Sequence, residues 1–166
     1  LKSMTKGLHS FEADGGGKVD AVISVFVSRF DRLLDADLAQ EGIDVSQTGI
    51  YNAAKIYNLV EKNYTPNIRT LFASTGVKGD DLAADYYIRG LYAAHSVNTA
   101  PLATIESFVK RKGVVPALPI EESEINGYFI KLADSGFDMK EVYDSLLKDG
   151  LEAFEKAFQE MLDSIQ

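Results

Sequence analysis

The chain of 166 residues carries 25 acidic against 17 basic side chains, a formal net charge of −8. Such an acidic chain lacks the basic face needed to bind nucleic acid or an anionic membrane surface. With no cysteine and two histidines, it excludes disulfides, thiolate chemistry and a cysteine- or histidine-rich metal site. It shows neither a signal peptide nor an apolar run of the ~20 residues that span a membrane, so we expect a soluble cytoplasmic protein.

The sequence predicts a helix from the first residue. Leu1, Met4 and Leu8 recur at helical spacing, and three glycines at 15–17 end the pattern. Because the chain opens inside an element, we expect it to be a piece of a longer protein. The following segment, 21-AVISVFVSRFD-31, opens with a nearly continuous apolar run. That run predicts a strand buried on both faces, as in a parallel sheet flanked by helices.

The middle of the chain alternates between helical and strand patterns. We predict a loop and short helix over residues 29–42, followed by a helix over 48–64. Two strand–helix pairs come next: a strand over 69–75 with a helix over 80–92, and a strand over 95–100 with a helix over 101–113. This alternation is typical of a parallel α/β fold. Polar side chains follow each predicted strand at its carboxyl end, where ligands bind in barrels and in open sheets.

The tail from residue 120 is helical throughout. We predict helices over 120–136, 138–150 and 150–165, with helix-end signals at Ser135-Gly136 and Asp149-Gly150. Four apolar residues of the last helix form a stripe that we expect to lie in the core: Phe154, Phe158, Met161 and Leu162. The plain interpretation is a helical cap packed on the α/β body.

Two cationic side chains follow neighbouring strands. Arg29 comes directly after the first strand, and its fixed fork of donors suits a phosphate or a carboxylate. The alternative is a salt bridge from Arg29 to Asp31 or to another acid at the rim, with Ser24 bonded to backbone. In 73-ASTGVKG-79, hydroxyls, glycines and Lys78 follow the second strand. This segment either forms a cradle of backbone N–H groups and a cation that binds an anion, or it is an ordinary loop. The turn with Arg29 and the loop with Lys78 could meet around one phosphate.

Five segments together resemble a known family. In chain order they are 23-ISVFVSRFD-31, 49-GIYNAAKIYNLVEK-62, 72-FASTGVK-78, 96-SVNTAP-101 and 149-DGLEAFEKAFQEMLDSI-165. They are similar to strands and helices of the transaldolases, in the longer bacterial subgroup, and the resemblance covers nearly the whole chain. It implies the C-terminal part of a (βα)8 TIM barrel. Residues 1–113 would be the last three barrel strands and helices, and residues 114–166 a C-terminal helical extension packed on the barrel.

The resemblance also implies an activity in the pentose phosphate pathway. Transaldolases are transferases that move a dihydroxyacetone unit from sedoheptulose 7-phosphate to glyceraldehyde 3-phosphate. They act through a lysine Schiff base, because a protonated imine accepts the electrons released on carbon–carbon cleavage. By match to the motifs, Arg29 and Lys78 would hold the phosphate, Ser24 and Ser74 would hydrogen-bond substrate or phosphate, and Phe26 would line the pocket. Lys78 stands where many members have an arginine, and a lysine gives up the bidentate grip.

The chain departs from the family in one respect, because the strands that bear the Schiff-base lysine and the proton-shuttling acids are missing. We therefore expect no catalytic residue in this chain, an inactive fragment, and a partner in the N-terminal part of the same barrel. The other partners implied are sugar-phosphate substrates, and neither metal nor organic cofactor is implied. His95 is expected to be structural. Two alternatives stay open: another sugar-phosphate aldolase or isomerase barrel, or a non-catalytic half-barrel interaction module.

Overall fold

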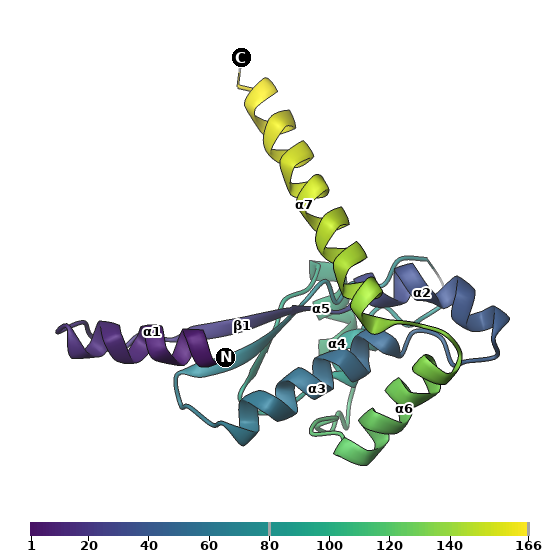
Figure 1. The fold of residues 1–166 in the computed structure, drawn as a ribbon, viewed down its shortest axis with the longest axis horizontal. Coiled ribbons are helices and arrows are strands. Elements are labelled where there is room, and N and C mark those ends of the chain that lie inside the picture. Colours follow the sequence, from purple (N-terminus) through teal and green to yellow (C-terminus); the bar gives the residue numbers. More distant parts are fainter. Residues whose placement is uncertain (80, 166) are drawn as a thin grey trace. The chain divides into compact units, whose positions relative to one another are not determined.

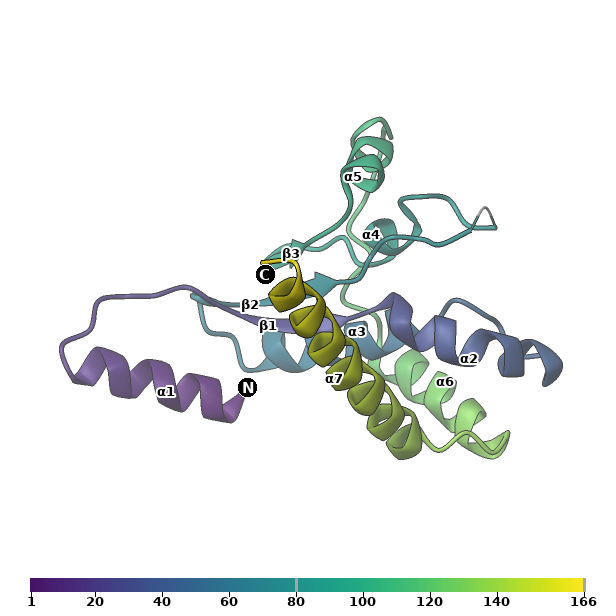
Figure 2. The same ribbon diagram turned by 90° about the horizontal axis from the view of Figure 1, so that it is seen from above.

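The computed structural model describes residues 1–79 and 81–165, and the chain divides into two compact units, residues 1–125 and 126–166. The first unit holds a sheet of three strands: β1 (Ala21–Phe26), β2 (Ile68–Ala73) and β3 (Ser96–Asn98). The strands are parallel and lie in the order β1-β2-β3 (Figures 1 and 2). The predicted alternation of helices with parallel strands is therefore confirmed.

Seven helices accompany the sheet in the described part of the chain. They are α1 (Lys2–Ala13), α2 (Ser28–Gln40), α3 (Thr48–Lys62), α4 (Tyr86–Gly90), α5 (Leu102–Val109), α6 (Glu122–Asp134) and α7 (Met139–Asp163). The boundary between the two units falls within α6. None of the described helices combines the length and the apolar character that crossing a bilayer demands.

Helix α3 covers one face of the sheet, and Figures 1 and 2 both show it running alongside β1 and β2. The Tyr57 ring of α3 lies 6.3 Å from the ring of Phe72, whose side chain is buried together with Val25 and Ile68. On the opposite face of β1, Ser24 and Phe26 are exposed. The prediction of a strand buried on both faces is wrong, because a single helical layer leaves the second face open.

The segment after β1 forms a longer helix than predicted. Instead of a loop and short helix over 29–42, α2 is a continuous helix of 13 residues that begins at Ser28. Phe30, Leu34 and Leu38 recur every four residues and are all buried. This apolar stripe extends the helix as far as Gln40, because each added turn buries a further side chain.

Helix α4 is shorter than the predicted helix over 80–92. It begins at Tyr86, and Asp80 lies outside the described residues. Asp85, just before the helix, is fully buried, and its two carboxylate oxygens accept from Nε and Nη2 of Arg111. The Arg111 guanidinium holds the pKa of Asp85 below its usual value of 3.8. This ion pair with a residue beyond α5 holds the Asp85 side chain just before α4, and the local sequence does not show it.

The tail also differs from the prediction. A single helix of 25 residues, α7, replaces the two helices expected over 138–150 and 150–165. A glycine inside a helix costs only about 1 kcal/mol, so Gly150 does not end it. The side chains of Phe154, Phe158 and Met161 are 63%, 58% and 50% exposed, and Leu162 is 39% exposed. The expectation that this stripe lies in a core is wrong, since two helices alone provide no interior for it.

Candidate functional site

The carboxyl ends of β1 and β2 are joined by hydrogen bonds. Val27 N donates to Ala73 O at 3.0 Å, and Ser28 N donates to Ser74 O at 3.1 Å. The hydroxyls of Ser28 and Ser74 share a further hydrogen bond of 3.1 Å. The first turn of α2 and the loop after β2 therefore meet at one edge of the sheet.

Arg29 lies in that first turn of α2 and is half-buried. Its guanidinium carbon sits 4.3 Å from the centre of the Phe26 ring, within the range of a cation–π interaction. In the described part of the chain Arg29 forms no salt bridge, and the alternative of a pair with Asp31 is not found. The donors at the edge of the guanidinium remain able to bind an oxyanion.

Ser24 and Phe26 lie on the face of β1 that α3 does not cover. Ser24 pairs in register with Leu71, and Phe26 pairs with Ala73. Paired residues of parallel strands point to the same face, so a polar hydroxyl and an aromatic ring lie in one row that leads toward Arg29. The Phe26 ring is 42% exposed, and in the described chain no hydrogen bond joins the Ser24 hydroxyl to backbone.

The loop after β2 begins in an unusual backbone conformation. Ser74 has φ of +57°, a left-handed value that turns the chain sharply at the end of the strand. The next residue, Thr75, is fully buried and donates its hydroxyl to Thr99 O at 2.6 Å, which fixes the loop against the residues after β3. Lys78 is exposed further along the loop, and in the described structure no contact joins it to Arg29.

Comparison with known proteins relates this arrangement to a family. The model of the family described as Transaldolase/Fructose-6-phosphate aldolase matches residues 1–165. The chain belongs to this family. A transaldolase from Helicobacter pylori (strain P12) is 40% identical over 144 residues, and one from Campylobacter jejuni subsp. jejuni serotype O:23/36 (strain 81-176) is 44% identical over 146 residues. The resemblance to transaldolases is therefore confirmed.

The match covers a larger share of this chain than of its relatives. Each of these relatives matches 87% of this chain, but the matched part is 45% of the Helicobacter protein and 42% of the Campylobacter protein. The chain thus spans less than half the length of these transaldolase relatives. A site shared by several strands of such a relative would have only part of its residues here.

Lysines are of special interest in a member of the transaldolase family. All twelve lysines of this chain have exposed side chains: Lys2, Lys6, Lys18, Lys55, Lys62, Lys78, Lys110, Lys112, Lys131, Lys140, Lys148 and Lys156. A lysine that forms a Schiff base usually sits in a desolvated pocket, which favours its neutral, nucleophilic form. None of these lysines is in such a pocket.

Two residues near the strand ends were not predicted as site residues. Ser28 is buried and its hydroxyl hydrogen-bonds to that of Ser74. Its position next to Arg29 is the sequence feature that indicates a place in the site. Asp31 is 1% exposed, and its Oδ1 accepts from Gly49 N at 2.9 Å, at the start of α3. Nothing in the sequence near Asp31 shows this bond, because it depends on how α2 packs against α3.

His95 lies away from this group of residues, just before β3. Its Nδ1 is 2.7 Å from Oε1 of Glu61, and its ring lies against Tyr64, with 4.8 Å between the centres. Both neighbours come from the end of α3 and the residues after it. At the amino ends of the strands His95 links α3 to the sheet, opposite the edge that carries Arg29.

Proposed function

We propose that this chain forms the phosphate-binding side of a transaldolase. The complete enzyme transfers a dihydroxyacetone unit from sedoheptulose 7-phosphate to glyceraldehyde 3-phosphate, through a Schiff base on a lysine outside this chain. Membership of the family and two transaldolase relatives at 40% and 44% identity support this activity. Such phosphorylated substrates indicate a cytoplasmic enzyme of the pentose phosphate pathway.

The proposal includes a (βα)8 barrel of which this chain is the C-terminal part. Residues 1–113 supply its last three strands and their helices, and residues 114–166 form a helical extension. The parallel order β1-β2-β3 and the cover of α3 on one face are what a sector of such a barrel requires. The remaining strands come from the N-terminal part of the same barrel, which is the partner that we propose.

The observation that carries the proposed role is the bond between the two strand ends. Ser28 and Ser74 meet at 3.1 Å, so the turn that bears Arg29 lies beside the loop that leads to Lys78. A phosphate bound at this edge takes the Arg29 fork, hydroxyl donors such as Ser74, and the charge of Lys78. Charged donors make stronger hydrogen bonds to phosphate than neutral ones do, so Arg29 contributes most.

The rest of the sugar extends along the open face of the sheet. Ser24 and Phe26 lie in one row of that face, and they offer a hydrogen bond and an apolar surface to the carbon chain. At the far end, the catalytic lysine condenses with the substrate ketone. Cleavage of the carbon–carbon bond releases the rest of the donor as an aldehyde and leaves the electron pair on the iminium, which becomes an enamine. The enamine attacks the acceptor aldehyde, and water then hydrolyses the new imine and frees the lysine.

The test uses the complete protein with fructose 6-phosphate as donor and borohydride to trap the Schiff base. We expect covalent trapping in the wild type. Arg29→Ala removes a charge-assisted hydrogen bond, so it should raise the KM for the donor roughly 10- to 100-fold while trapping persists at saturating donor. Arg32→Ala, an exposed arginine one turn along α2, is the control and should leave KM unchanged. Equal KM values for Arg29→Ala and wild type would refute the phosphate role.

A second activity is favoured by the description of the family, which also names fructose-6-phosphate aldolase. Both activities form the same Schiff base, so trapping does not separate them. An aldolase releases free dihydroxyacetone without an acceptor, whereas a transaldolase holds the enamine until an aldehyde arrives. Measuring dihydroxyacetone release from fructose 6-phosphate, with and without an added aldose phosphate, therefore distinguishes the two.

A further inference from the structure

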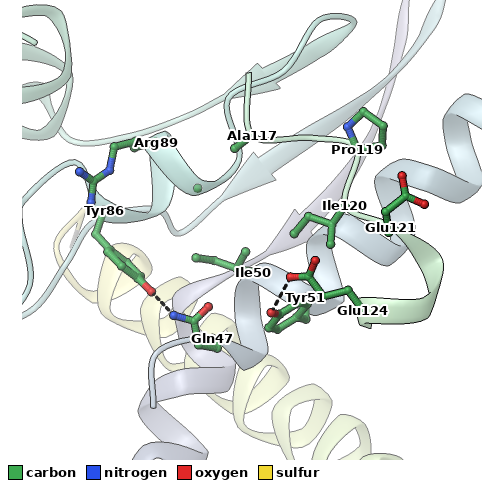
Figure 3. A pocket seen from close by; sticks show the side chains of 11 residues that line it. Gln47, Ile50, Tyr51, Tyr86, Arg89, Ala117, Pro119, Ile120, Glu121 and Glu124 are labelled. Carbon is green, nitrogen blue, oxygen red and sulfur yellow. Dashed lines mark hydrogen bonds between the residues drawn. The ribbon is translucent and has the colours of Figure 1, made fainter. Parts of the chain in front are cut away.

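The first unit contains a cleft of about 500 Å³ between the start of α3, helix α4, the segment 117–121 and the first turn of α6 (Figure 3). This volume lies within the range of small-molecule sites in proteins. None of the five residues proposed for sugar-phosphate binding lines it. The cleft is therefore a second candidate site, separate from the strand ends.

The walls of the cleft carry opposite charges. Arg89 of α4 stands at one side, while Glu121 and Glu124 stand at the other, as Figure 3 shows. All three side chains are exposed, and in the described structure Arg89 forms no ion pair. The carboxylate of Glu121 likewise forms no ion pair among the described residues. Both charges are thus available to a ligand.

Hydrogen bonds hold the polar groups between these charges in place. Gln47 Nε2 donates to the Tyr86 hydroxyl at 2.7 Å, and that hydroxyl donates to Ser46 O at 3.0 Å. This arrangement fixes the Gln47 amide and leaves its carbonyl oxygen as an acceptor. On the acidic side, the Tyr51 hydroxyl donates to Oε1 of Glu124 at 2.9 Å, which positions that carboxylate. A fixed set of polar groups lowers the ordering cost of binding.

Apolar side chains lie beside these polar groups between the charged walls. Ile50 projects from α3 at the centre of the view and is 7% exposed, and Ile120 faces it from the segment before α6 (Figure 3). Ala117 and Pro119 extend this surface. A ligand that crosses from Arg89 to the glutamates passes over this hydrocarbon, which favours a methylene chain or a similar apolar middle.

We propose that this cleft binds a small zwitterion with separated charges, of the ω-amino carboxylate type. Its ammonium group lies between Glu121 and Glu124, with the Gln47 carbonyl as a further acceptor. Its apolar middle packs on Ile50 and Ile120, and its carboxylate pairs with the Arg89 fork. Two acids against one arginine make the ammonium end the more strongly attracted of the two.

The experiment measures binding of 4-aminobutanoate, 6-aminohexanoate and 8-aminooctanoate to the complete protein by calorimetry at low ionic strength. Hexanoate and hexylamine, which each carry one charge, are the reference ligands. We expect one chain length of amino acid to bind at least about tenfold more tightly than both references, because it uses both walls at once. Added salt should weaken this binding, since exposed ion pairs are screened.

Two variants test whether the amino acid binds in this cleft. Arg89→Ala and Glu121→Gln should each reduce the affinity for the preferred amino acid about tenfold, to that of a singly charged ligand. Arg32→Ala removes an exposed arginine that does not line the cleft, and it should leave the affinity unchanged. The proposal is overturned if no amino acid binds better than hexanoate and hexylamine, or if Arg89→Ala binds as the wild type does. Neither outcome depends on transaldolase activity.

Discussion

Asp31 is a buried carboxylate with one satisfied oxygen. Its Oδ1 accepts from Gly49 N, while Oδ2 has no hydrogen-bond partner in the described structure. Burial raises the pKa of Asp31 from 3.8 to about 6, against the opposing effect of the Gly49 amide. A carboxyl group that loses its hydration without a cation nearby is more stable when protonated.

This pKa predicts how stability depends on pH. The folded pKa lies above the unfolded one, so the contribution of Asp31 to stability is fully present below about pH 4 and is lost as the pH rises through about 6. Asp31→Asn removes the titration but keeps an acceptor for Gly49 N. Compared with wild type, the variant should gain about 2 kcal/mol in its free energy of unfolding between pH 4 and pH 7.

Urea unfolding of the complete protein at several pH values measures this difference. Asp37→Asn serves as the control, because Asp37 is an exposed aspartate on the same helix. Its stability should follow the wild-type curve throughout. Parallel curves for Asp31→Asn and wild type would show that the pKa of Asp31 is not raised in the folded protein.

At the scale of elements, the start of α3 is packed directly on the end of β1. A Cβ at Gly49 would collide with the carbonyl of Val27, whose carbon would lie 2.9 Å away, and would come within 3.1 Å of Asp31 Oδ2. Backbone cannot move aside as a flexible side chain can. Only glycine allows this approach, which places α3 close beneath the turn that carries Arg29.

Gly49→Ala should therefore destabilise the protein by about 3 kcal/mol, the upper range for overpacking at a tight contact. The matched control is Gly127→Ala in α6, where nothing lies within 4 Å of the added methyl group. There the same change should stabilise by about 0.5–1 kcal/mol, because alanine is the better helix former. Thermal unfolding of both variants in the complete protein gives the comparison, and similar effects of the two would contradict the close contact.

The elements differ in how far the sequence predicts them. The pattern around Ile50 and Tyr57 predicts α3 correctly, because its apolar face packs on the sheet and its period is visible locally. The distant pair of Asp85 with Arg111, which lies just before α4, is shown by no local pattern. Position after a strand was sufficient to single out Arg29 and Ser74. The hydrogen bond of Asp31 to Gly49 could not be predicted from the sequence, because it depends on how α2 and α3 pack together.

For the whole molecule, large apolar side chains are left uncovered in the first unit. Leu102 and Val109 of α5 are 71% and 73% exposed, and Val115 is 71% exposed. In the described chain no further strand pairs with the outer edges of β1 and β3. Both features lower the stability of the isolated chain. Buried apolar area and paired strands are what offset the loss of chain entropy on folding.

The purified 166-residue chain should therefore lack a cooperative thermal transition. We expect a gradual loss of helical circular dichroism on heating, and a sharp transition when the proposed N-terminal part of the barrel is present. Urea titrations followed by tyrosine fluorescence should show the same contrast. A sharp transition of the chain alone, at a concentration where it is monomeric, would contradict this prediction.

The outer edge of β1 has a consequence for production of the protein in cells. Its sequence, 21-AVISVF-26, holds neither a charged residue nor a proline, the usual gatekeepers that keep exposed strands from pairing wrongly. A strand of another copy can add there as readily as the neighbouring strand of the proposed barrel can. Solubility of newly made chains will thus depend on how soon that strand arrives. Ser24→Lys would protect the edge, at the expense of the row that we propose faces the sugar.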